Sequence, residues 1–318
     1  MNNYTNCFLS RSVLKSVKLG GFRKRIFILL LTITMGCETI VDIDIPMDKP
    51  LLVVSSSLDT DGWPKLRLTY SKHILDNASG YHQVVNGQVH IQENDGPWIL
   101  MEKNEVDGLV TYRTLDLFLK ENHTYTYRIQ VSGYDELLLS EHTPKKVPIK
   151  EVRFNGTRNV QEWNTEQDVT VIFDDPLGRN FYELSIFTYL SVDLGTDSYG
   201  NPIQYQVAGN ANFVPKNPVY ETDYYSEQTL LFDDRLFDGE EAIMDLLIQG
   251  TIMEDTYEGE VYFNLKSVTE SYYQYHTTSA LQDWNDGDPF AQPVQVYSNI
   301  PKGLGILMGS TLDIFQYK

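Results

Sequence analysis

Cys37 is the side chain whose surroundings most clearly predict chemistry. It follows six basic residues, the apolar run 26–35 and Gly36. A positive segment, a short apolar segment and a small residue at the cleavage point are typical of a secretory signal, and about ten apolar residues are too few to span a bilayer. A cysteine directly after such a cleavage point is where bacterial lipoproteins carry a diacylglyceryl group. We therefore expect removal of residues 1–36 and lipidation of Cys37.

The thiol inventory follows from this prediction. Cys7 would leave with the leader, and an acylated Cys37 would leave the mature chain with neither a free thiol nor a disulfide. The stretch Thr34-Met-Gly-Cys37 is similar to a lipobox in which threonine replaces the usual leucine. Two or three acyl chains on one cysteine, palmitate among them, would hold the protein at the membrane almost permanently.

Charge and the segment behind Cys37 indicate where the lipid would place the protein. Residues 38–50 (ETIVDIDIPMDKP) predict a short tether, and acidic residues there are similar to the tag that exports Bacteroidota lipoproteins to the cell surface. Loss of the six basic residues of 1–36 would leave 19 Lys and Arg against 44 Asp and Glu, changing the formal net charge from −19 to −25. Such a surface repels nucleic acid and anionic headgroups. We expect an outer-membrane protein, facing the cell surface, with no nucleic-acid partner.

Tyrosine carries the main signal for recognition. The chain has 21 tyrosines, and the glycine- and asparagine-rich stretch 187–225 is dense in them. Tyrosine offers a large, rigid and amphipathic contact area, but it is also common in strands, so recognition and a structural role both remain open. The candidate ligand-binding residues are Tyr199, Tyr205, Tyr220, Tyr224 and Tyr225.

Patterns for catalysis are weaker. The mature chain would lack an unacylated cysteine, and it contains no Gly-x-Ser-x-Gly elbow. Two carboxylates could hydrolyse a glycosidic bond, but with 44 acidic residues a close pair is expected by chance. We therefore expect no enzymatic activity.

Candidate metal ligands are also outweighed by simpler explanations. His73, His82 and His90 fall in polar or exposed segments and are expected to be solvated. Two acidic groups offer the oxygen ligands that calcium prefers, Asp283, Asn285, Asp286 and Asp288 around Gly287, and Asp233, Asp234 and Asp238 near Gly239. The first lacks the spacing and the bidentate glutamate of an EF-hand, and Arg235 would neutralise part of the second. We expect solvated turns, with no metal and no cofactor.

The elements that would position these residues are mostly strands. Short alternating segments separated by turn residues every eight to twelve positions predict an immunoglobulin-like antiparallel β-sandwich over 51–146. Residues 149–318 predict a second β-rich domain, either a sandwich or a barrel. Ser267 and Glu270 form a capping-box pattern that predicts one helix near residues 268–284, with Val268, Tyr272, Tyr275 and Leu281 as its buried stripe. The glycines of 303–309 fit turns or close backbone approach.

Several motifs carry a family resemblance. They are Phe173-Asp-Asp-Pro176, Asn180-Phe-Tyr182, Phe232-Asp-Asp-Arg-Leu-Phe-Asp-Gly239, Ser267-Val-Thr-Glu-Ser-Tyr-Tyr-Gln-Tyr275, Asp288-Pro-Phe-Ala-Gln-Pro-Val-Gln-Val-Tyr-Ser-Asn-Ile300 and Gly303-Leu-Gly305-Ile. Together they resemble a Bacteroidota lipoprotein family catalogued as domain of unknown function 4249. The resemblance covers nearly all of the mature chain. It implies an outer-membrane lipoprotein, often encoded beside a TonB-dependent receptor, and it implies no catalytic residue.

Three functions stay open at this point. The leading expectation is a non-catalytic accessory or ligand-capture subunit of a TonB-dependent transporter, with a receptor as partner and an unknown nutrient as ligand. The first alternative is a stand-alone surface adhesin or structural lipoprotein. The second alternative is a surface hydrolase acting on glycans or peptides.

Overall fold

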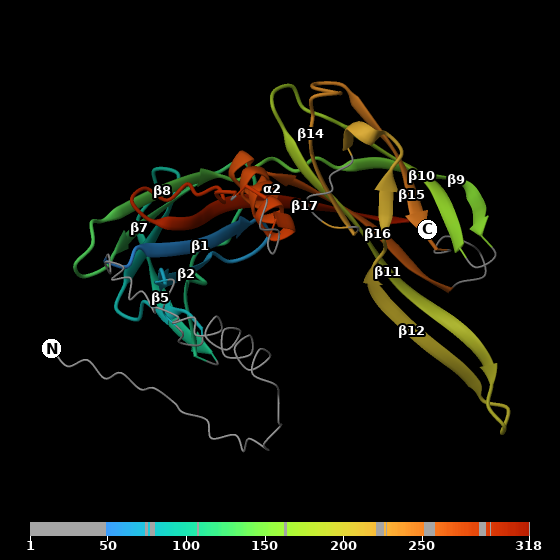
Figure 1. The fold of residues 1–318 in the computed structure, drawn as a ribbon, viewed down its shortest axis with the longest axis horizontal. Coiled ribbons are helices and arrows are strands. Elements are labelled where there is room, and N and C mark those ends of the chain that lie inside the picture. Colours follow the sequence, from blue (N-terminus) through green and yellow to red (C-terminus); the bar gives the residue numbers. More distant parts are fainter. Residues whose placement is uncertain are drawn as a thin grey trace, which may run out of the picture. The chain divides into compact units, whose positions relative to one another are not determined.

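The computed structural model describes residues 49–73, 76, 80–106, 108–161, 164–220, 226, 228–250, 258–285, 291–292 and 294–317. Residues 49–318 form one compact unit, drawn in colour in Figure 1. The predicted signal peptide, Cys37 and most of the predicted tether lie outside the described residues.

Strands dominate this unit. Those before residue 145 are β1 (Leu52–Asp59), β2 (Lys65–Tyr70), β3 (His82–Gln83), β4 (Gln88–Glu93), β5 (Ile99–Val106), β6 (Leu109–Arg113), β7 (Thr124–Gln130) and β8 (Leu137–His142). Those that follow are β9 (Ile149–Gln161), β10 (Asn164–Asp174), β11 (Phe181–Thr196), β12 (Pro202–Asn210), β13 (Phe213–Pro215), β14 (Thr229–Asp233), β15 (Glu241–Gln249), β16 (Glu258–Val268) and β17 (Leu304–Tyr317). The helical elements are η1 (Pro218–Tyr220) and α2 (Glu270–Asn285).

The first half of the chain folds as a β-sandwich. Strands β1, β2 and β6 form one layer and β4, β7 and β8 the other, and β5 joins the layers because it pairs with β6 and with β4 at different residues. Alternating side chains of each layer are buried, as in the run Leu52, Val54 and Leu58 of β1. Neighbouring strands within 51–146 are all antiparallel.

Tyrosines fix the packing of this first core. Tyr125 is fully buried at the start of β7, and its hydroxyl accepts a hydrogen bond from the Lys120 N–H at 2.9 Å. A tyrosine hydroxyl bonded to the backbone a few residues upstream is similar to the tyrosine corner of immunoglobulin-like sandwiches. Tyr127, two residues on, receives a hydrogen bond from the Ser56 hydroxyl of the facing layer at 3.1 Å.

The C-terminal strand β17 joins the two halves of the chain. It pairs in parallel with β1 and antiparallel with β16, so one sheet continues from the first core into the second. Gly305 has a φ of +101°, and a Cβ there would lie 1.9 Å from the carbonyl oxygen of Val54. Only glycine fits such an approach of two backbones, in agreement with the predicted role of the glycines in this segment.

The second core lies between two layers of strands. Strands β11, β14 and β16 supply buried side chains from one layer, and β10 and β15 of the four-stranded sheet supply those of the other. Strand β15 shows how the sequence places side chains in this core. Its buried residues, Ala242, Met244, Leu246 and Ile248, alternate with exposed or half-buried ones. Both sheets have open ends, which supports a sandwich rather than a barrel for this region.

The predicted helix exists, but its start differs from the prediction. Helix α2 begins at Glu270, and Thr269 caps it with a hydroxyl that accepts a hydrogen bond from the Tyr272 N–H at 3.3 Å. Ser267 instead lies within β16, which ends at Val268, so the predicted capping role of Ser267 is wrong. Tyr272 is buried, but Tyr275 and Leu281 are only half-buried, so the predicted buried stripe is correct in its first turn alone.

The mainly β fold with one helix is confirmed. The sequence did not indicate that β17 pairs with β1 in the sheet of the first core. Ile300 and Leu307 contribute buried side chains to that core. The predicted division into domains near residue 147 stays a prediction.

Candidate functional site

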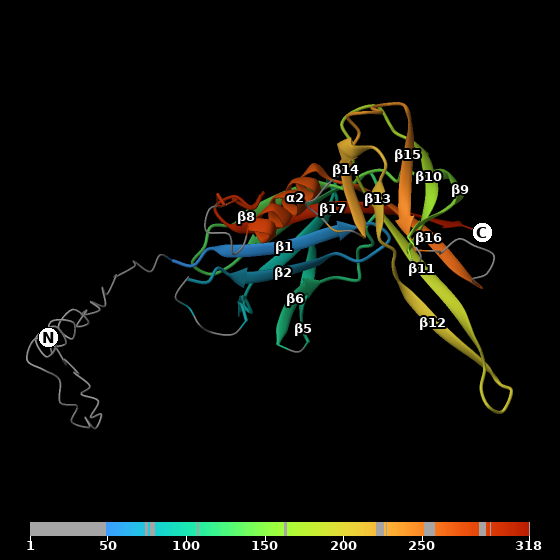
Figure 2. The same ribbon diagram turned by 45° about the vertical axis from the view of Figure 1, so that its right-hand side comes forward.

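A long two-stranded arm extends from the larger sheet. Strand β12 ends the larger sheet and pairs only with β11 among those residues, with Val192 opposite Tyr205. On its other side β11 pairs with β16 only as far as Ser191. Beyond Ser191 the described chain is therefore a two-stranded ribbon, which projects away from both cores in Figures 1 and 2. We call residues 188–210 the arm.

The second half of the arm, from Ser198 onward, carries no charged residue. Tyr199 at its tip is 89% exposed, and Ile203 and Val207 of β12 are 41% and 42% exposed. No charged residue occurs between Asp197 and Lys216, although 22% of the chain is charged. Exposed apolar side chains on an uncharged segment favour contact with another macromolecule or a ligand.

A turn built on Asp197 presents Tyr199. One carboxylate oxygen of Asp197 accepts hydrogen bonds from the backbone N–H groups of Tyr199 and Asn201, both at 2.8 Å, and the Gly200 N–H donates to the Asp197 carbonyl at 3.0 Å. These bonds hold the pKa of Asp197 below its usual range, led by the one from the Asn201 side chain. The turn is ordered by its own residues, and the tyrosine ring points to solvent.

Of the predicted ligand-binding tyrosines, Tyr199 and Tyr220 are the two whose side chains the structure describes, and one is exposed while the other is buried. Tyr199 is at the tip of the arm and the backbone of Tyr205 is in β12. Tyr220 is only 8% exposed and packs against Phe232 and Phe237, although it also lines a small hollow of about 240 Å³. Tyr224 and Tyr225, like Cys37, lie outside the described residues.

A cluster of three carboxylates was only partly indicated by the sequence. Asp234 and Asp238 were candidates there, but Asp175 was not, because it comes from a distant loop. Ligand oxygens of the three lie within 4.8 Å of one another, close enough to hold a hard cation such as Ca²⁺. The fourth candidate, Asp233, turns away and binds the Arg235 guanidinium at 2.6 Å.

The protein's own donors already engage these carboxylates. Asp175 accepts hydrogen bonds from the Tyr182 hydroxyl and from the Gly239 N–H at 2.9 Å. Burial nevertheless raises the pKa of Asp175, and the charge of Asp234 adds to the rise. Asp234 and Asp238 accept from the N–H groups of Asn180 and Gly178, at 2.6 and 2.8 Å. These hydrogen bonds join the loops 175–180 and 234–239, and we call Asp175, Asp234 and Asp238 the clasp.

Among the described residues, the other calcium and histidine candidates do not gather into a site. Asp283 and Asn285 are in the last turn of α2, and Asp286 to Asp288 lie outside the described residues. His82 forms a contact with Asp76 at 2.7 Å between Nε2 and Oδ2. Across the part of the chain that the structure describes, the only group of three or more possible ligands at metal-binding distance is the clasp.

A buried ionic network lies beneath α2. Glu183 is 5% exposed and accepts hydrogen bonds from Lys266 Nζ at 2.6 Å and from the Tyr272 hydroxyl. The ring of His276 lies 4.3 Å from that of Tyr272, and burial lowers the pKa of His276. The network links α2 to β11 and β16. A buried charge pair of this kind can hold α2 in position and does not by itself indicate a catalytic role.

Family motifs meet around a cavity of about 370 Å³ between the end of β8 and the start of α2. Asn180, Phe181, Tyr182 and residues 267–270 line it, and Arg179 and Glu270 form an ion pair at 2.8 Å at its side. The resemblance motifs thus build the joint between the sandwich and the second core.

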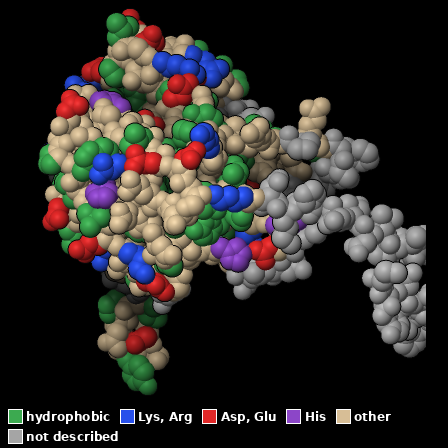
Figure 3. All heavy atoms as spheres, turned by 90° about the vertical axis from the view of Figure 1, so that its left-hand side faces the viewer, with side chains coloured by type: hydrophobic (Ala, Val, Ile, Leu, Met, Phe, Trp, Pro, Cys, Tyr) green, Lys and Arg blue, Asp and Glu red, His purple; other side chains and the backbone are tan. Residues whose placement is uncertain are grey.

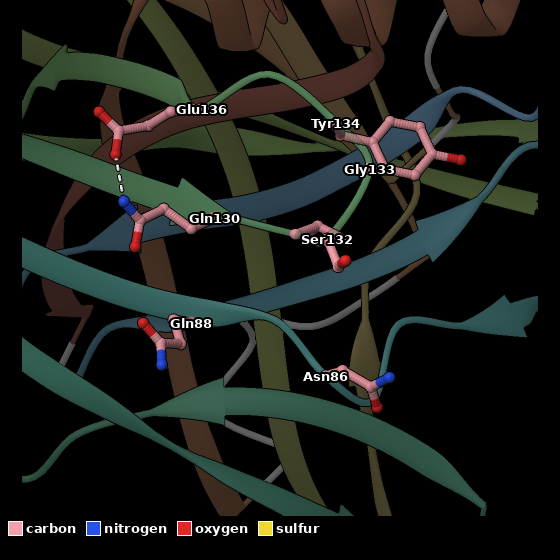
Figure 4. A pocket seen from close by; sticks show the side chains of 8 residues that line it. Asn86, Gln88, Gln130, Ser132, Gly133, Tyr134 and Glu136 are labelled. Carbon is pink, nitrogen blue, oxygen red and sulfur yellow. Dashed lines mark hydrogen bonds between the residues drawn. The ribbon is translucent and has the colours of Figure 1, made fainter.

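A second hollow lies on the first sandwich. Figure 4 shows the neutral polar side chains of Asn86, Gln88, Gln130 and Ser132 beside Tyr134 around a volume of about 440 Å³. Gln130 donates to the Glu136 carboxylate at 2.5 Å. Figure 3 shows that acidic, basic and hydrophobic side chains intermingle on one face of the molecule, without a single charged patch.

Comparison with known proteins gives the class of this chain. A family model described as "Domain of unknown function (DUF4249)" matches residues 38–313. The chain belongs to this family, as its motifs indicated. A search of the curated proteins finds no match. Among the described residues no helix is both long enough and apolar enough to cross a membrane.

Proposed function

We propose that this family member is a lipid-anchored outer-membrane protein that recognises a partner without catalysis, as an accessory or ligand-capture subunit of a TonB-dependent transporter. The observation that carries the recognition role is the projecting arm, uncharged from Ser198 onward, with Tyr199 exposed at its tip. A rigid aromatic side chain held by an ordered turn loses little entropy on binding, which is the property of a contact residue.

The chemistry of the described residues favours binding over hydrolysis. Asp175 and Asp234, the buried members of the only close carboxylate cluster there, are 6% and 4% exposed. Both accept hydrogen bonds from the protein's own backbone, so a substrate would have to displace those bonds to reach them. The transporter as partner rests on the family resemblance. The membrane attachment rests on the predicted lipidation, and the surface-facing location rests on the acidic segment behind Cys37.

The partner is tested by purification of the tagged full chain from gently solubilised outer membranes, with mass spectrometry of the proteins that accompany it. We expect a near-stoichiometric TonB-dependent receptor. Recovery of the chain by itself would favour the adhesin alternative.

Two variants locate the contact. Tyr199→Ala should lower recovery of the receptor several-fold, whereas Tyr81→Ala, which removes a tyrosine 64% exposed on the first sandwich, should leave it unchanged. Equal recovery from both variants would exclude the tip of the arm as the contact.

The anchor is tested separately with Cys37→Ala. The variant should lose the label from a fatty-acid precursor and leave the outer-membrane fraction. A variant that stays labelled and membrane-bound would show that Cys37 is not the lipidated residue.

A further inference from the structure

The outer edge of β12 has the features of an unsatisfied strand. Among the described residues β12 pairs on one side only, so its other side presents backbone N–H and C=O groups to solvent. Natural proteins protect such edges with charges, bulges or proline. Here the devices are Pro202 at the first position and a register shift in the β11–β12 pair between Asp193 and Thr196, whereas residues 203–210 carry no charge.

The ribbon also lacks the support that strands need. Beyond Ser191 the described arm has two strands, and a two-stranded ribbon is marginal in water without a third strand or a core. The side chains of Ile203 and Val207 are about two-fifths exposed. A strand added at β12 would cover part of them and pair the open backbone.

The sequence of β12 specifies what kind of strand would fit. The segment Ile203-Gln-Tyr-Gln-Val207 reads nearly the same in both directions about Tyr205. In an antiparallel pair with a two-fold axis at Tyr205, Ile203 of one copy lies opposite Val207 of the other, and Gln204 lies opposite Gln206. This register would pair aliphatic with aliphatic, amide with amide and aromatic with aromatic residues, and such like-with-like pairs are favourable across strands.

Charge agrees with a second copy as the occupant. The chain is strongly acidic, so two copies repel one another over most of their surfaces. The run from Ser198 to Pro215 has no charged residue and allows close approach. A two-fold interface must be complementary to itself, which this nearly symmetric segment satisfies.

We propose that β12 pairs antiparallel with β12 of a second copy of this chain, about a two-fold axis at Tyr205, so that the larger sheets of two copies become continuous. This pairing is independent of the transporter partner proposed above and of the lipid anchor. It makes the arm a dimerisation element whose tip, with Tyr199, stays free.

Cysteine cross-linking in outer membranes tests the register. In Tyr205→Cys the two Cys residues face each other at about 4.5–5.5 Å between Cα atoms, within the range of a disulfide. In Val207→Cys the two are four residues apart along the strand, about 13 Å, which is too far. Tyr199→Cys at the tip reports chance collision, and the parent chain reports any contribution of Cys37.

With mild oxidation and non-reducing electrophoresis of the full chain, we expect a dimer band for Tyr205→Cys several-fold stronger than for the other two variants. The absence of a dimer at 205, equal bands at all three positions, or a cross-link from 205 to a different protein would each overturn the proposal.

A second variant keeps the test decisive if Tyr205→Cys folds poorly. Val207→Lys places a charge on the edge and should reduce the dimer fraction of the detergent-solubilised full chain severalfold, measured by mass photometry. Val214→Lys is the matched control, because Val214 is 43% exposed and lies in another edge strand, β13. A dimer fraction that is unchanged in Val207→Lys, or reduced equally by both changes, would exclude β12 as the interface.

Discussion

Strands β7 and β12 both alternate polar residues with apolar or aromatic ones, yet the surroundings of the two strands differ. Strand β7 is paired on both sides, by β4 and β8, and its Tyr125 and Tyr127 are fully buried with bonded hydroxyls. Strand β12 is paired on one side among the described residues, and the side chains of its Ile203 and Val207 are about two-fifths exposed. Alternation in the sequence therefore predicts that a segment is a strand. The number of neighbouring strands and layers decides whether the side chains of that strand stabilise the fold or remain available for contact.

The largest expected contrast comes from tyrosine truncation. Tyr127→Ala should lower the free energy of unfolding by about 3–5 kcal/mol, because it empties a fully buried site in the first core. Tyr199→Ala should change it by less than about 0.5 kcal/mol. Chemical denaturation of the purified protein measures both, and similar losses from the two variants would contradict the division between core and arm.

Glycine substitutions make the same comparison through the backbone. Gly305→Ala should cost about 3 kcal/mol or more, since a Cβ in this left-handed conformation would meet the Val54 carbonyl. A Cβ at Gly209 of the arm meets nothing within 4 Å, and Gly209→Ala should be neutral within about 0.5 kcal/mol. If thermal unfolding ranks the two variants equally, the close pairing of β1 and β17 is not a main support of the sheet.

The sequence was sufficient for the elements that depend on local pattern. Alternation located the strands of the first sandwich, the capping-box pattern located the helix, and the chemistry of glycine accounted for Gly305. It was insufficient where distant segments meet. The parallel pairing of β17 with β1 and the contact of Asp175 with Asp234 depend on tertiary structure, which spacing along the chain does not encode. The helix start was misplaced by two residues because the Ser267–Glu270 pattern has a second cap candidate, Thr269, within it.

For the candidate site, the sequence correctly indicated that the stretch 187–225 is rich in tyrosine but could not separate buried from exposed ones. Tyr220 and Tyr199 each lie within three residues of an Asn-Pro pair, Asn217-Pro218 and Asn201-Pro202. What separates them is packing, because Tyr220 faces Phe232 and Phe237 while Tyr199 lies at the end of a ribbon. The absence of charge from 198 to 215 was the available signal for the arm.

A hydroxyl deletion gives a smaller effect with a pH signature. Tyr125→Phe leaves the Lys120 N–H without its acceptor and should cost about 1–3 kcal/mol. Burial raises the pKa of Tyr125 from 10.0 to about 12. The unfolded chain therefore loses this proton first, so the free energy of unfolding of the parent should fall as pH rises above 10.

The Phe variant should lack that part of the alkaline decrease, measured by denaturation at pH 9, 10 and 11. Tyr189→Phe on the arm is the control, because its hydroxyl donates to Gln206 Oε1 at 2.6 Å in a solvated setting, and it should alter stability by less than about 0.5 kcal/mol. An alkaline decrease that persists fully in Tyr125→Phe would show that another group causes it.

The smallest expected effect concerns the order of the arm itself. Asp197→Ala removes the acceptor for the N–H groups of Tyr199 and Asn201, so these two amides should exchange with solvent faster, as measured by hydrogen exchange. The melting temperature should stay unchanged, since the tip contacts neither core. Loss of protection that spread from the tip to β16 would mean that the turn stabilises the whole sheet edge. Tyr205 lies beyond the turn. If two copies pair at β12, the backbone amides of β12 should therefore stay protected from exchange in Asp197→Ala. Faster exchange of the amides of both the tip and β12 would show that the turn alone kept the arm ordered.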